Sequence, residues 1–411
     1  MHVLHVIDQK PDGYPGGIEY HQLDLIRYFR EKSIPVSLLF PEENSLCLRR
    51  YQGDLVEESM YGGMKLDDHR LRDPGMEDSF RRVLTDTGAD IVHFQSIRTM
   101  PLSFIEIAKN AGVQVIVSFH EYYFWCINCI MLAPDFCWFE RDEEKCHACL
   151  AGSNYPVPEG YVKTRRAYIN QLFSKIDRVI MPSFYVRDVF LSLYQGLTEE
   201  QCAVIEFGVG KKLLADYGRT AKRAPNGCLK LAFLGNFLPY KGNRTFLELL
   251  DCYRDSRFIR FSIIGNIFDH SIIPSRHNLS LAGGYARDEV VKKIQKESPD
   301  VILLLSNWPE TFSYTLSEAI AGGVPVIATD GGALRERVSK FSAGFLVPVE
   351  NPLPRLVEII EDLRENPGVL EFLNGAVSRA RGRLRTVDDM AESIVSLYRS
   401  LLAGSDGETT G

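Results

Sequence analysis

Residues 301–338, with the sequence VILLLSNWPETFSYTLSEAIAGGVPVIATDGGALRERV, decide the fold of this chain. They open with an apolar run, which predicts a buried strand, and pass through a loop into a helix that ends near Gly322 and Gly323. A second apolar run at residues 324–328 predicts another strand. Strand, helix and strand in this order form one unit of a parallel sheet, and ligands bind beyond the carboxyl ends of such strands.

Two carboxylates lie near this edge of the predicted sheet. Glu310 follows the first strand, and Glu318 lies on the helix after a gap of seven residues, so both can face one crevice. The start of the helix offers backbone N–H groups and a positive dipole end, which suit a phosphate. Carboxylates accept hydrogen bonds from hydroxyl groups, which suits a sugar. The simpler alternative is two acids on an ordinary αβ unit.

This stretch resembles the Glu-x7-Glu signature of retaining glycosyltransferases in the large group 4 family, and residues 308–312 and 321–325 match as well. The resemblance implies the GT-B fold: an α/β chain with two Rossmann-like domains facing a cleft and a C-terminal helix crossing back to the N-terminal domain. It also implies that Glu310 contacts the donor sugar and Glu318 the ribose. The donor-binding residues expected here are Glu310, Thr311, Phe312, Ser313, Tyr314, Thr315 and Glu318.

The composition is that of a globular protein. A chain of 411 residues suggests two domains, and 45% apolar and 25% charged residues are ordinary values. The net charge of −7 argues against general nucleic-acid binding. No apolar run reaches the roughly 18 residues of a membrane span, and residues 1–9 read as a strand without the features of a signal peptide. We expect a cytoplasmic protein, with peripheral contact at the inner membrane face left open.

Strands and helical patterns alternate through the N-terminal half, which predicts a parallel sheet flanked by helices. The strands are expected at residues 3–7, 36–40, 91–94 and 113–119. Residues 41–74 are polar and contain glycine, so we expect little regular structure there. The first strand leads into a glycine loop that lacks GxGxxG, so a dinucleotide fingerprint is absent. The family resemblance places Gly16 and Gly17 of this loop against the donor diphosphate; a plain βα turn is the alternative.

His120 follows the strand at residues 113–119. The family usually has His-Asp at this point, and its histidine contacts the sugar near the reacting carbon, so the resemblance gives this role to His120. Glu121 replaces the usual Asp, which leaves the role of the acid open. The alternative is a strand-end histidine that is satisfied by a neighbouring carbonyl group.

Five of the nine cysteines lie between residues 126 and 149, and two Cys-x-x-Cys pairs among them have the spacing of a structural zinc site. We expect Cys146 and Cys149 to be ligands, with Cys126 and Cys137 completing the set and Cys129 as an alternative. Free thiols, a redox pair and an iron–sulfur cluster are the competing interpretations. Zinc would brace an insert at residues 122–150, and some bacterial surface-polysaccharide enzymes of the resembled family carry cysteines at this point.

A basic cluster lies on the helix that is predicted at residues 161–173. It comprises Lys163, Arg165 and Arg166. We expect a solvated helix face, and contact with an anionic membrane surface or a diphosphate-linked acceptor is the alternative.

The C-terminal half supplies a lysine for the donor phosphates. The strand at residues 229–234 leads into a loop that begins at Gly235 and resembles the family's Gly-Arg…Lys-Gly motif. Lys241 matches the lysine of that motif, but Asn236 stands where an arginine is usual. By the same resemblance Gly265 opens a loop that could border the base, and Tyr285 is placed in the segment that lines it.

The sequence thus predicts a glycosyltransferase that moves a sugar from a UDP- or GDP-sugar to the hydroxyl group of a saccharide or lipid-linked saccharide, with His120, Lys241 and Glu310 as catalytic residues. No Asp-x-Asp triplet occurs, so a metal ion at the diphosphate is not indicated. The alternatives are a non-catalytic nucleotide-sugar-binding subunit and a sugar-nucleotide epimerase. The expected domains are residues 1–210 and 228–385, followed by a helix at 386–403 and a disordered tail at 404–411.

Overall fold

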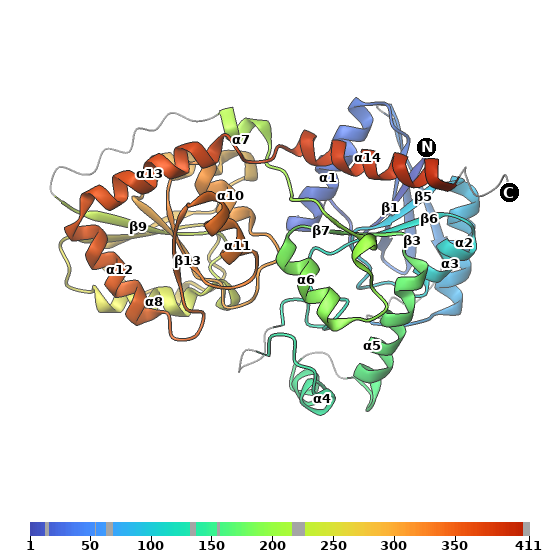
Figure 1. Cartoon of the computed structure of the whole chain (residues 1–411), viewed down its shortest axis with the longest axis horizontal. Helices are drawn as coiled ribbons and strands as arrows, with labels where there is room; N and C mark the ends of the chain where they lie inside the picture. The colour runs from blue at the N-terminus through green and yellow to red at the C-terminus, as the bar shows by residue number, and fades with distance from the viewer. Residues whose placement is uncertain are drawn as a thin grey trace. The chain divides into compact units, whose positions relative to one another are not determined.

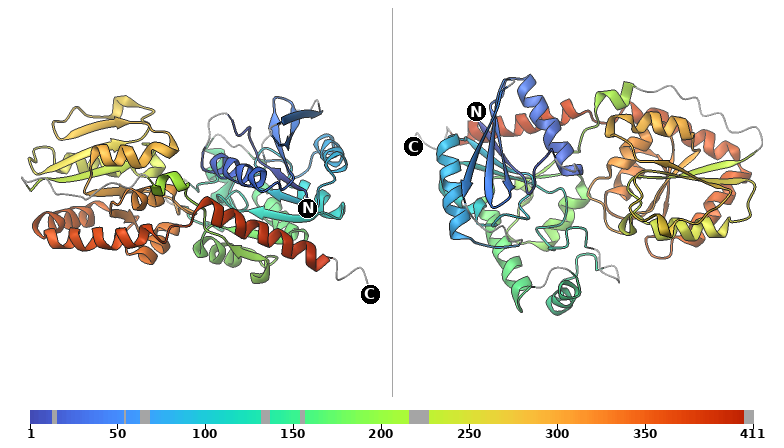
Figure 2. Two further views of the ribbon diagram at one scale, coloured as in Figure 1. Left: turned by 90° about the horizontal axis from the view of Figure 1, so that it is seen from above. Right: turned by 180° about the vertical axis from the view of Figure 1, so that it is seen from behind.

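The chain forms two compact α/β units, which we describe separately (Figure 1). The computed structural model describes residues 1–12, 16–53, 55–62, 69–131, 137–153, 157–215 and 227–405. The first unit comprises Met1–Phe207 and Val387–Gly411, and the second Gly208–Thr386. Each unit has one sheet with helices on its faces, which confirms the expected α/β fold with two Rossmann-like domains (Figure 2).

The first unit is built on an eight-stranded sheet with the order β4-β3-β2-β1-β5-β6-β7-β8. Its strands are β1 (Val3–Val6), β2 (Val36–Glu42), β3 (Ser45–Gln52), β4 (Leu55–Gly62), β5 (Ile91–Phe94), β6 (Gln114–Ser118), β7 (Arg178–Met181) and β8 (Cys202–Val204). Its helices before the last one are α1 (Gly17–Glu31), α2 (Pro74–Thr87), α3 (Phe104–Asn110), α4 (Glu143–Ala151), α5 (Tyr161–Leu172) and α6 (Phe184–Leu193). Strand β1 lies between β2 and β5 in parallel register, and all four of its residues are buried, as expected for a central parallel strand.

The hairpin of β3 and β4 contradicts the expectation of little regular structure at residues 41–74. Both strands pair antiparallel at the edge of the sheet, with Leu39 opposite Leu48 and Arg49 opposite Glu58. The Arg49 Nε atom lies 2.8 Å from Glu58 Oε1. An edge strand with one solvated face accepts charged residues, and these side chains obscure the apolar pattern in the sequence. Residues 63–68 lie outside the described part of this stretch.

The last helix, α14 (Val387–Ser405), belongs to the first unit, in keeping with the expected return of the C-terminal helix. It packs against α1, and the buried hydroxyl of Tyr398 lies 3.1 Å from His5 Nε2 and 2.5 Å from His93 Nδ1. These two histidines lie on β1 and β5, so Tyr398 joins the helix to the centre of the sheet. Of the tail that is predicted at residues 404–411, residues 404 and 405 end α14, and residues 406–411 lie outside the described residues.

The second unit is a six-stranded parallel sheet with the order β11-β10-β9-β12-β13-β14. Its strands are β9 (Leu229–Leu234), β10 (Ile259–Ile264), β11 (Leu279–Gly283), β12 (Val301–Leu304), β13 (Val326–Thr329) and β14 (Gly344–Val347). Its helices are α7 (Lys211–Ala215), α8 (Asn243–Cys252), α9 (Val290–Glu297), α10 (Tyr314–Ala321), α11 (Gly332–Phe341), α12 (Leu353–Glu365) and α13 (Pro367–Arg381). Alternate residues of β9 serve two cores: Ala232 and Leu234 pack with α10, and Leu231 and Phe233 pack with α8 and α12.

The longest described helix is α14, with 19 residues, and its first turn carries Asp388 and Asp389. Among the residues that the structure describes, no helix combines the length and the apolar character that crossing a bilayer requires.

Candidate active site

A lysine and a glutamate meet at the carboxyl edge of the second sheet. Strands β9 and β12 are neighbours, so the loops that follow them run side by side, and the Lys241 Nζ atom lies 2.8 Å from Glu310 Oε1. Gly242 holds the lysine loop against the β12 loop with a φ of 85°, and an added Cβ would lie 2.0 Å from the Leu305 carbonyl oxygen. The Lys-Gly pair of the sequence motif therefore has a steric reason.

Glu310 is held as a buried anion. Its residue is 4% exposed, and its carboxylate accepts hydrogen bonds from Lys241 and from the Ser306 hydroxyl. Burial alone would raise the pKa of Glu310, but the charge and hydrogen bond of Lys241, with help from Ser306 and Ser313, bring it below its ordinary value. The backbone is also anchored, since the Ala333 N–H donates to the Glu310 carbonyl at 2.7 Å. An ionised carboxylate of this kind is a ready acceptor for hydroxyl groups.

Helix α10 begins beside this pair in a form that suits an anion. Its N-cap, Ser313, has a φ of 71° and makes no side-chain cap hydrogen bond to the first turn. The buried Arg337 fixes this turn by donating hydrogen bonds to the Phe312 carbonyl at 3.0 Å and the Ser313 carbonyl at 2.8 Å. The Ser313 and Thr315 hydroxyls lie 3.1 Å apart. The backbone N–H groups and the dipole of the first turn therefore point at the same edge as Lys241.

Glu318 has the opposite electrostatic setting to Glu310. It lies on α10, is 7% exposed and accepts a hydrogen bond from the Tyr285 hydroxyl at 3.2 Å. Burial raises the pKa of Glu318 to about 7, against the opposing effects of Arg287, Tyr285 and Lys241. Lys241 thus acts electrostatically on both carboxylates, which places all three groups in one neighbourhood.

The glycines of the expected donor site lie where loops touch. Gly235 has a φ of 109°, and a Cβ there would lie 3.1 Å from Thr315 Cγ2. Gly265 faces Gly235 so closely that a Cβ would lie 1.8 Å from the Gly235 carbonyl oxygen. Asn236, at the position where an arginine was expected by the motif, accepts a hydrogen bond from Asn266 at 3.1 Å. The loops after β9 and β10 and the start of α10 are therefore in direct contact.

In the second unit, the structure gathers the predicted donor residues at one edge of one sheet. The sequence did not single out Ser306, Arg287 or Arg337, which orient or tune them. The position of Ser306 just after a buried strand is a signal that could have found it. Nothing local in the sequence connects Arg337 to Phe312, because that contact depends on how α11 packs.

The remaining predicted residues lie in the first unit. Gly16 caps α1, and its N–H donates to Glu19 Oε2 at 2.7 Å; residues 13–15 of the same loop lie outside the described residues. His120 Nε2 lies 2.8 Å from Gln95 Oε1, and its ring packs on Phe207 and, at 4.8 Å, on His21 of α1. Gly17 opens α1 itself. The start of α1 and His120 therefore belong to one neighbourhood of the first unit.

Burial sets the protonation states of His120 and Glu121. It lowers the pKa of His120 to about 3, so the imidazole is neutral at physiological pH. Burial also raises the pKa of Glu121 to about 8, with an opposing effect from the backbone N–H of Tyr123. Glu121 is consequently protonated at neutral pH and does not act as the anion that the usual Asp would supply.

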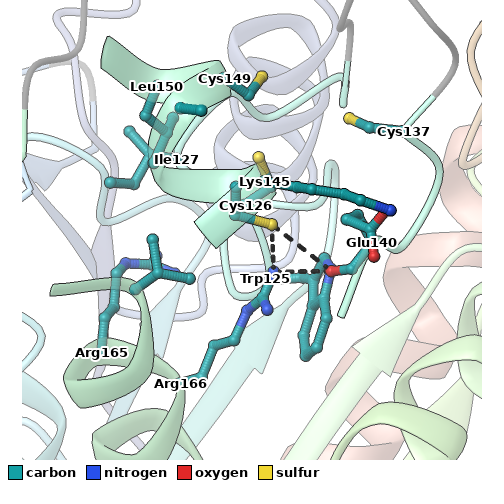
Figure 3. Close-up of a pocket in the computed structure, with 13 residues that line it drawn as sticks. Trp125, Cys126, Ile127, Cys137, Glu140, Lys145, Cys149, Leu150, Arg165 and Arg166 are labelled. Carbon is teal, nitrogen blue, oxygen red and sulfur yellow. Dashed lines mark hydrogen bonds and ion pairs between the residues drawn. The ribbon is translucent and has the colours of Figure 1, made fainter. Parts of the chain in front are cut away.

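Four of the five clustered cysteines line one pocket of about 510 Å³ in the first unit (Figure 3). They are Cys126, Cys137, Cys146 and Cys149. Cys129 turns away, donating to the Ile127 carbonyl at 3.4 Å and interacting with Glu121. The insert contains α4, a helix that we did not expect. Arg165 is only 2% exposed, so the predicted solvated helix face is wrong for this residue.

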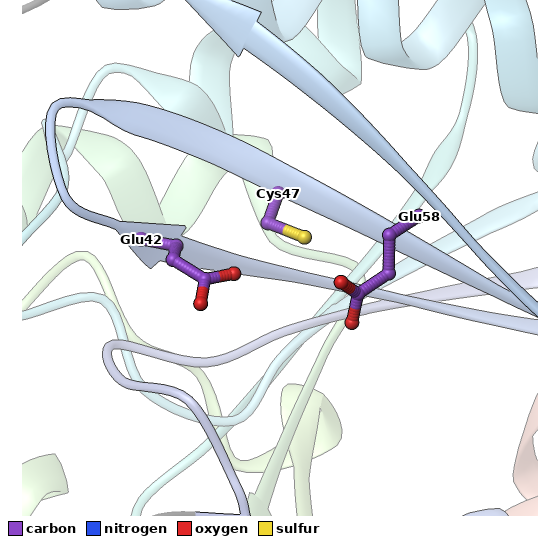
Figure 4. A group of neighbouring side chains, drawn as sticks. All are labelled: Glu42, Cys47 and Glu58. Carbon is purple, nitrogen blue, oxygen red and sulfur yellow. The ribbon is translucent and has the colours of Figure 1, made fainter.

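A second group of potential metal ligands, Glu42, Cys47 and Glu58, lies on the neighbouring strands β2, β3 and β4 of the first sheet (Figure 4). Its carboxylates already have cationic partners: Lys10 lies 2.5 Å from Glu42 and Arg49 lies 2.8 Å from Glu58. Burial raises the pKa of the Cys47 thiol to about 12. Carboxylates that are neutralised by side chains, beside a protonated thiol, form an ion-pair network rather than a metal site.

Two family models match the chain in succession. Residues 15–210 match Glycosyltransferase Family 4, and residues 219–382 match Glycosyl transferases group 1. A relative from Escherichia coli (strain K12), named as a colanic acid biosynthesis glycosyl transferase, is 25% identical over 78% of this chain and 79% of its own length. A GDP-mannose-dependent alpha-mannosyltransferase of Mycobacterium tuberculosis (strain CDC 1551 / Oshkosh) is 27% identical over 57% of this chain and 65% of its own.

Solved structures resemble the whole fold. Sucrose-phosphate synthase from Thermosynechococcus elongatus superposes with a TM-score of 0.68 at 15% identity, covering 98% of this chain and all of that one. Anabaena HepE in complex with UDP gives a TM-score of 0.64 at 15% identity, with 97% of this chain and 100% of that one covered.

Proposed function

Since this chain belongs to the group 4 glycosyltransferases of the GT-B fold, we propose that it transfers a sugar from a nucleotide diphosphate sugar to a hydroxyl group of a saccharide acceptor, with retention of anomeric configuration. The observation that carries this proposal is the Lys241–Glu310 pair beside the start of α10. It offers a cation and helix N–H groups for a diphosphate and a buried anion for sugar hydroxyls.

In the proposed complex, the donor binds along this edge. Its diphosphate lies against the first turn of α10 and Lys241, its sugar hydroxyls donate to Glu310, and its ribose hydroxyls donate to Glu318. Asn236 supplies no positive charge, and Arg287, whose guanidinium lies 5.1 Å from the Tyr314 ring centroid, supplies a second cation close to α10. In the first unit, the family resemblance assigns Gly16 and Gly17 to the donor diphosphate and His120 to the reacting sugar.

The chemistry relies on the leaving group. The bond between the anomeric carbon and the phosphate oxygen breaks, and the acceptor oxygen bonds to that carbon from the same face. The acceptor proton passes to the departing phosphate oxygen. Lys241 and the helix amides stabilise the charge that develops on the diphosphate, the kind of electrostatic effect that dominates many enzymes. Glu310 orients the sugar and stabilises positive charge on it, and neutral His120 contacts the sugar without exchanging a proton.

The relatives support a role in glycoconjugate biosynthesis but name different donors. The E. coli relative is named for colanic acid biosynthesis, the mycobacterial one depends on GDP-mannose, and the Anabaena neighbour was solved with UDP. We therefore propose a surface polysaccharide or related glycoconjugate as the product, and either a UDP- or a GDP-sugar as the donor.

A panel of UDP-, GDP- and ADP-sugars, assayed for nucleoside diphosphate release with and without oligosaccharide acceptors, tests the proposal. We expect acceptor-dependent release from one donor and its loss in Glu310→Ala. A non-catalytic binding subunit, the reading that Asn236 favours, would bind a nucleotide sugar without turnover. An epimerase would interconvert the sugar without acceptor transfer. Either result overturns the proposed transfer.

A further inference from the structure

The insert after His120 holds a cysteine pocket that the proposed sugar transfer does not use. We propose that Cys126, Cys137, Cys146 and Cys149 bind one structural zinc ion, and that this ion braces the insert against α4 and α5. These four cysteines line one pocket, and two arginines lie beside it.

The neighbour relations among the thiols select four of the five cysteines. Cys126 lies close enough to Cys137 and Cys146 for electrostatic interaction, and Cys149 interacts in the same way with Cys146 and with Cys137. These four cysteines all line the same pocket, and Figure 3 shows three of them, Cys126, Cys137 and Cys149, around it. Cys146 and Cys149 are three residues apart on α4, so they share one face of that helix. Cys129 interacts with Glu121 and is not among the residues that line the pocket.

Two arginines at this pocket have no carboxylate partner among the described residues. Arg165 is 2% exposed, and its neighbours are the Tyr123 carbonyl and ring, with the ring centroid at 4.5 Å. Arg166 donates to Cys146 Sγ at 3.3 Å, and its guanidinium lies 3.6 Å from the Trp125 ring centroid. Zinc with four thiolates carries a net charge of −2, which two arginines match. An N–H donor to a ligand sulfur is also the usual outer partner of such a site.

The insert is anchored unevenly: Tyr122, Tyr123 and Phe124 are buried in the first unit, whereas the part around α4 has only a small apolar core. That small core consists of Ile127 and Leu150 of the insert with Val162 of α5, and Cys146 packs at its margin. A core of this size adds little stability around α4, so a metal ion there would add to it. The pocket volume of about 510 Å³ leaves room for the thiols to turn inward. Among the described residues, Glu42, Cys47 and Glu58 are the only group of three or more potential ligands whose ligand atoms lie within 4.8 Å of one another. The four pocket thiols must therefore move closer together to bind zinc.

A zinc ion at this pocket would also limit the movement of the turn that follows His120. The Tyr122 N–H donates to the Cys129 carbonyl at 3.0 Å, and the Cys126 N–H donates to the Tyr122 carbonyl at 2.8 Å. Cys126 is therefore joined to the turn that directly follows His120. Bracing Cys126 limits the movement of that turn.

Elemental analysis of the full-length protein, purified without chelators, tests the site. We expect about one zinc per chain, as in other four-thiolate sites. Cys149→Ser should lose most of that zinc, whereas the matched control Cys129→Ser should retain it. Absence of metal in the wild type, iron together with inorganic sulfide, or equal loss of zinc in both variants would overturn the proposal.

Because a cysteine variant can fail to fold, a second measurement uses the wild-type chain. Zinc is removed with a chelator under reducing conditions and replaced by Co²⁺, which absorbs visible light strongly when four thiolates surround it in a tetrahedron. The expected result is that spectrum, its bleaching by added zinc, and a melting temperature that falls on metal removal and recovers on zinc addition. No spectrum, or disulfide bonds among the four cysteines detected by mass spectrometry of the untreated protein, would refute the site.

Discussion

Replacing Lys241 with methionine separates the two roles that the structure gives this residue. The change keeps the apolar stem and removes the ammonium group that lies 2.8 Å from Glu310. A positioned donor to a developing oxyanion contributes about 10²–10³-fold to kcat, or about 3–4 kcal/mol, so Lys241→Met should lower kcat by that factor. The exposed Lys296 at the end of α9 provides the matched control, and Lys296→Met should leave kcat unchanged.

The same change should also destabilise the protein. The Glu310 side chain is 5% exposed and that of Lys241 is 27% exposed, so the variant leaves a buried carboxylate without its ion pair. Removing one partner of a fully buried pair costs about 3–5 kcal/mol; the partial exposure of Lys241 and the hydrogen bond from Ser306 reduce the expectation to about 1–3 kcal/mol. The pKa of Glu310 should rise, which moves the acid limb of the kcat/KM profile to higher pH.

A double variant distinguishes the two roles. Lys241→Met with Glu310→Gln buries a neutral amide in place of an unpaired carboxylate, so the melting temperature should recover most of its loss while turnover does not recover. Steady-state nucleoside diphosphate release and thermal melting, measured on the same preparations, give both quantities. Near wild-type kcat in Lys241→Met, or recovery of turnover in the double variant, would refute the reasoning.

Three further predictions concern Glu318, Gly242 and Tyr398. Burial raises the pKa of Glu318 from its ordinary value of 4.5 to about 7, so the stability of the folded protein should fall as the pH rises from about 4.5 through 7. Donor KM should also fall toward pH 7 as the carboxylate forms. Melting temperatures and KM values measured against pH should show neither trend in Glu318→Gln. Gly242→Ala, with its clash at 2.0 Å, should lower both the melting temperature and activity, while Gly368→Ala, with open space around it, should change neither. Tyr398→Phe removes the hydroxyl between two buried histidines and should lower the free energy of unfolding by about 1–3 kcal/mol in urea titration, and an unchanged transition would contradict the anchoring role of α14.

The sequence predicts the parallel core well because its signal is local. Strands that are buried on both faces appear as apolar runs, and residues 301–305 correspond closely to β12. The hairpin of β3 and β4 was missed because its charged face pairs across strands, as Arg49 does with Glu58.

In the candidate site, too, some residues have a local sequence signal and others depend on tertiary packing. Glu310, Glu318 and Lys241 were found from a motif, and the motif reflects neighbouring strands that bring their loops together. Arg337 reaches the site only through tertiary packing, and the hydrogen bond from the predicted Tyr285 to Glu318 likewise depends on the fold. The choice among the cysteines also required three dimensions, because the spacing of Cys129 is as good as that of Cys126 and only the fold turns it toward Glu121.

The central claim is that Lys241, Glu310 and Glu318 converge on one diphospho-sugar. A crystal structure with an intact nucleotide sugar, chosen from the donor panel, measures this directly. The account predicts the diphosphate within hydrogen-bonding distance of Lys241 Nζ and the first N–H groups of α10, sugar hydroxyls on Glu310 and ribose hydroxyls on Glu318. A nucleotide that binds with its phosphates away from α10, or that leaves the Lys241–Glu310 contact without a ligand beside it, would contradict the claim.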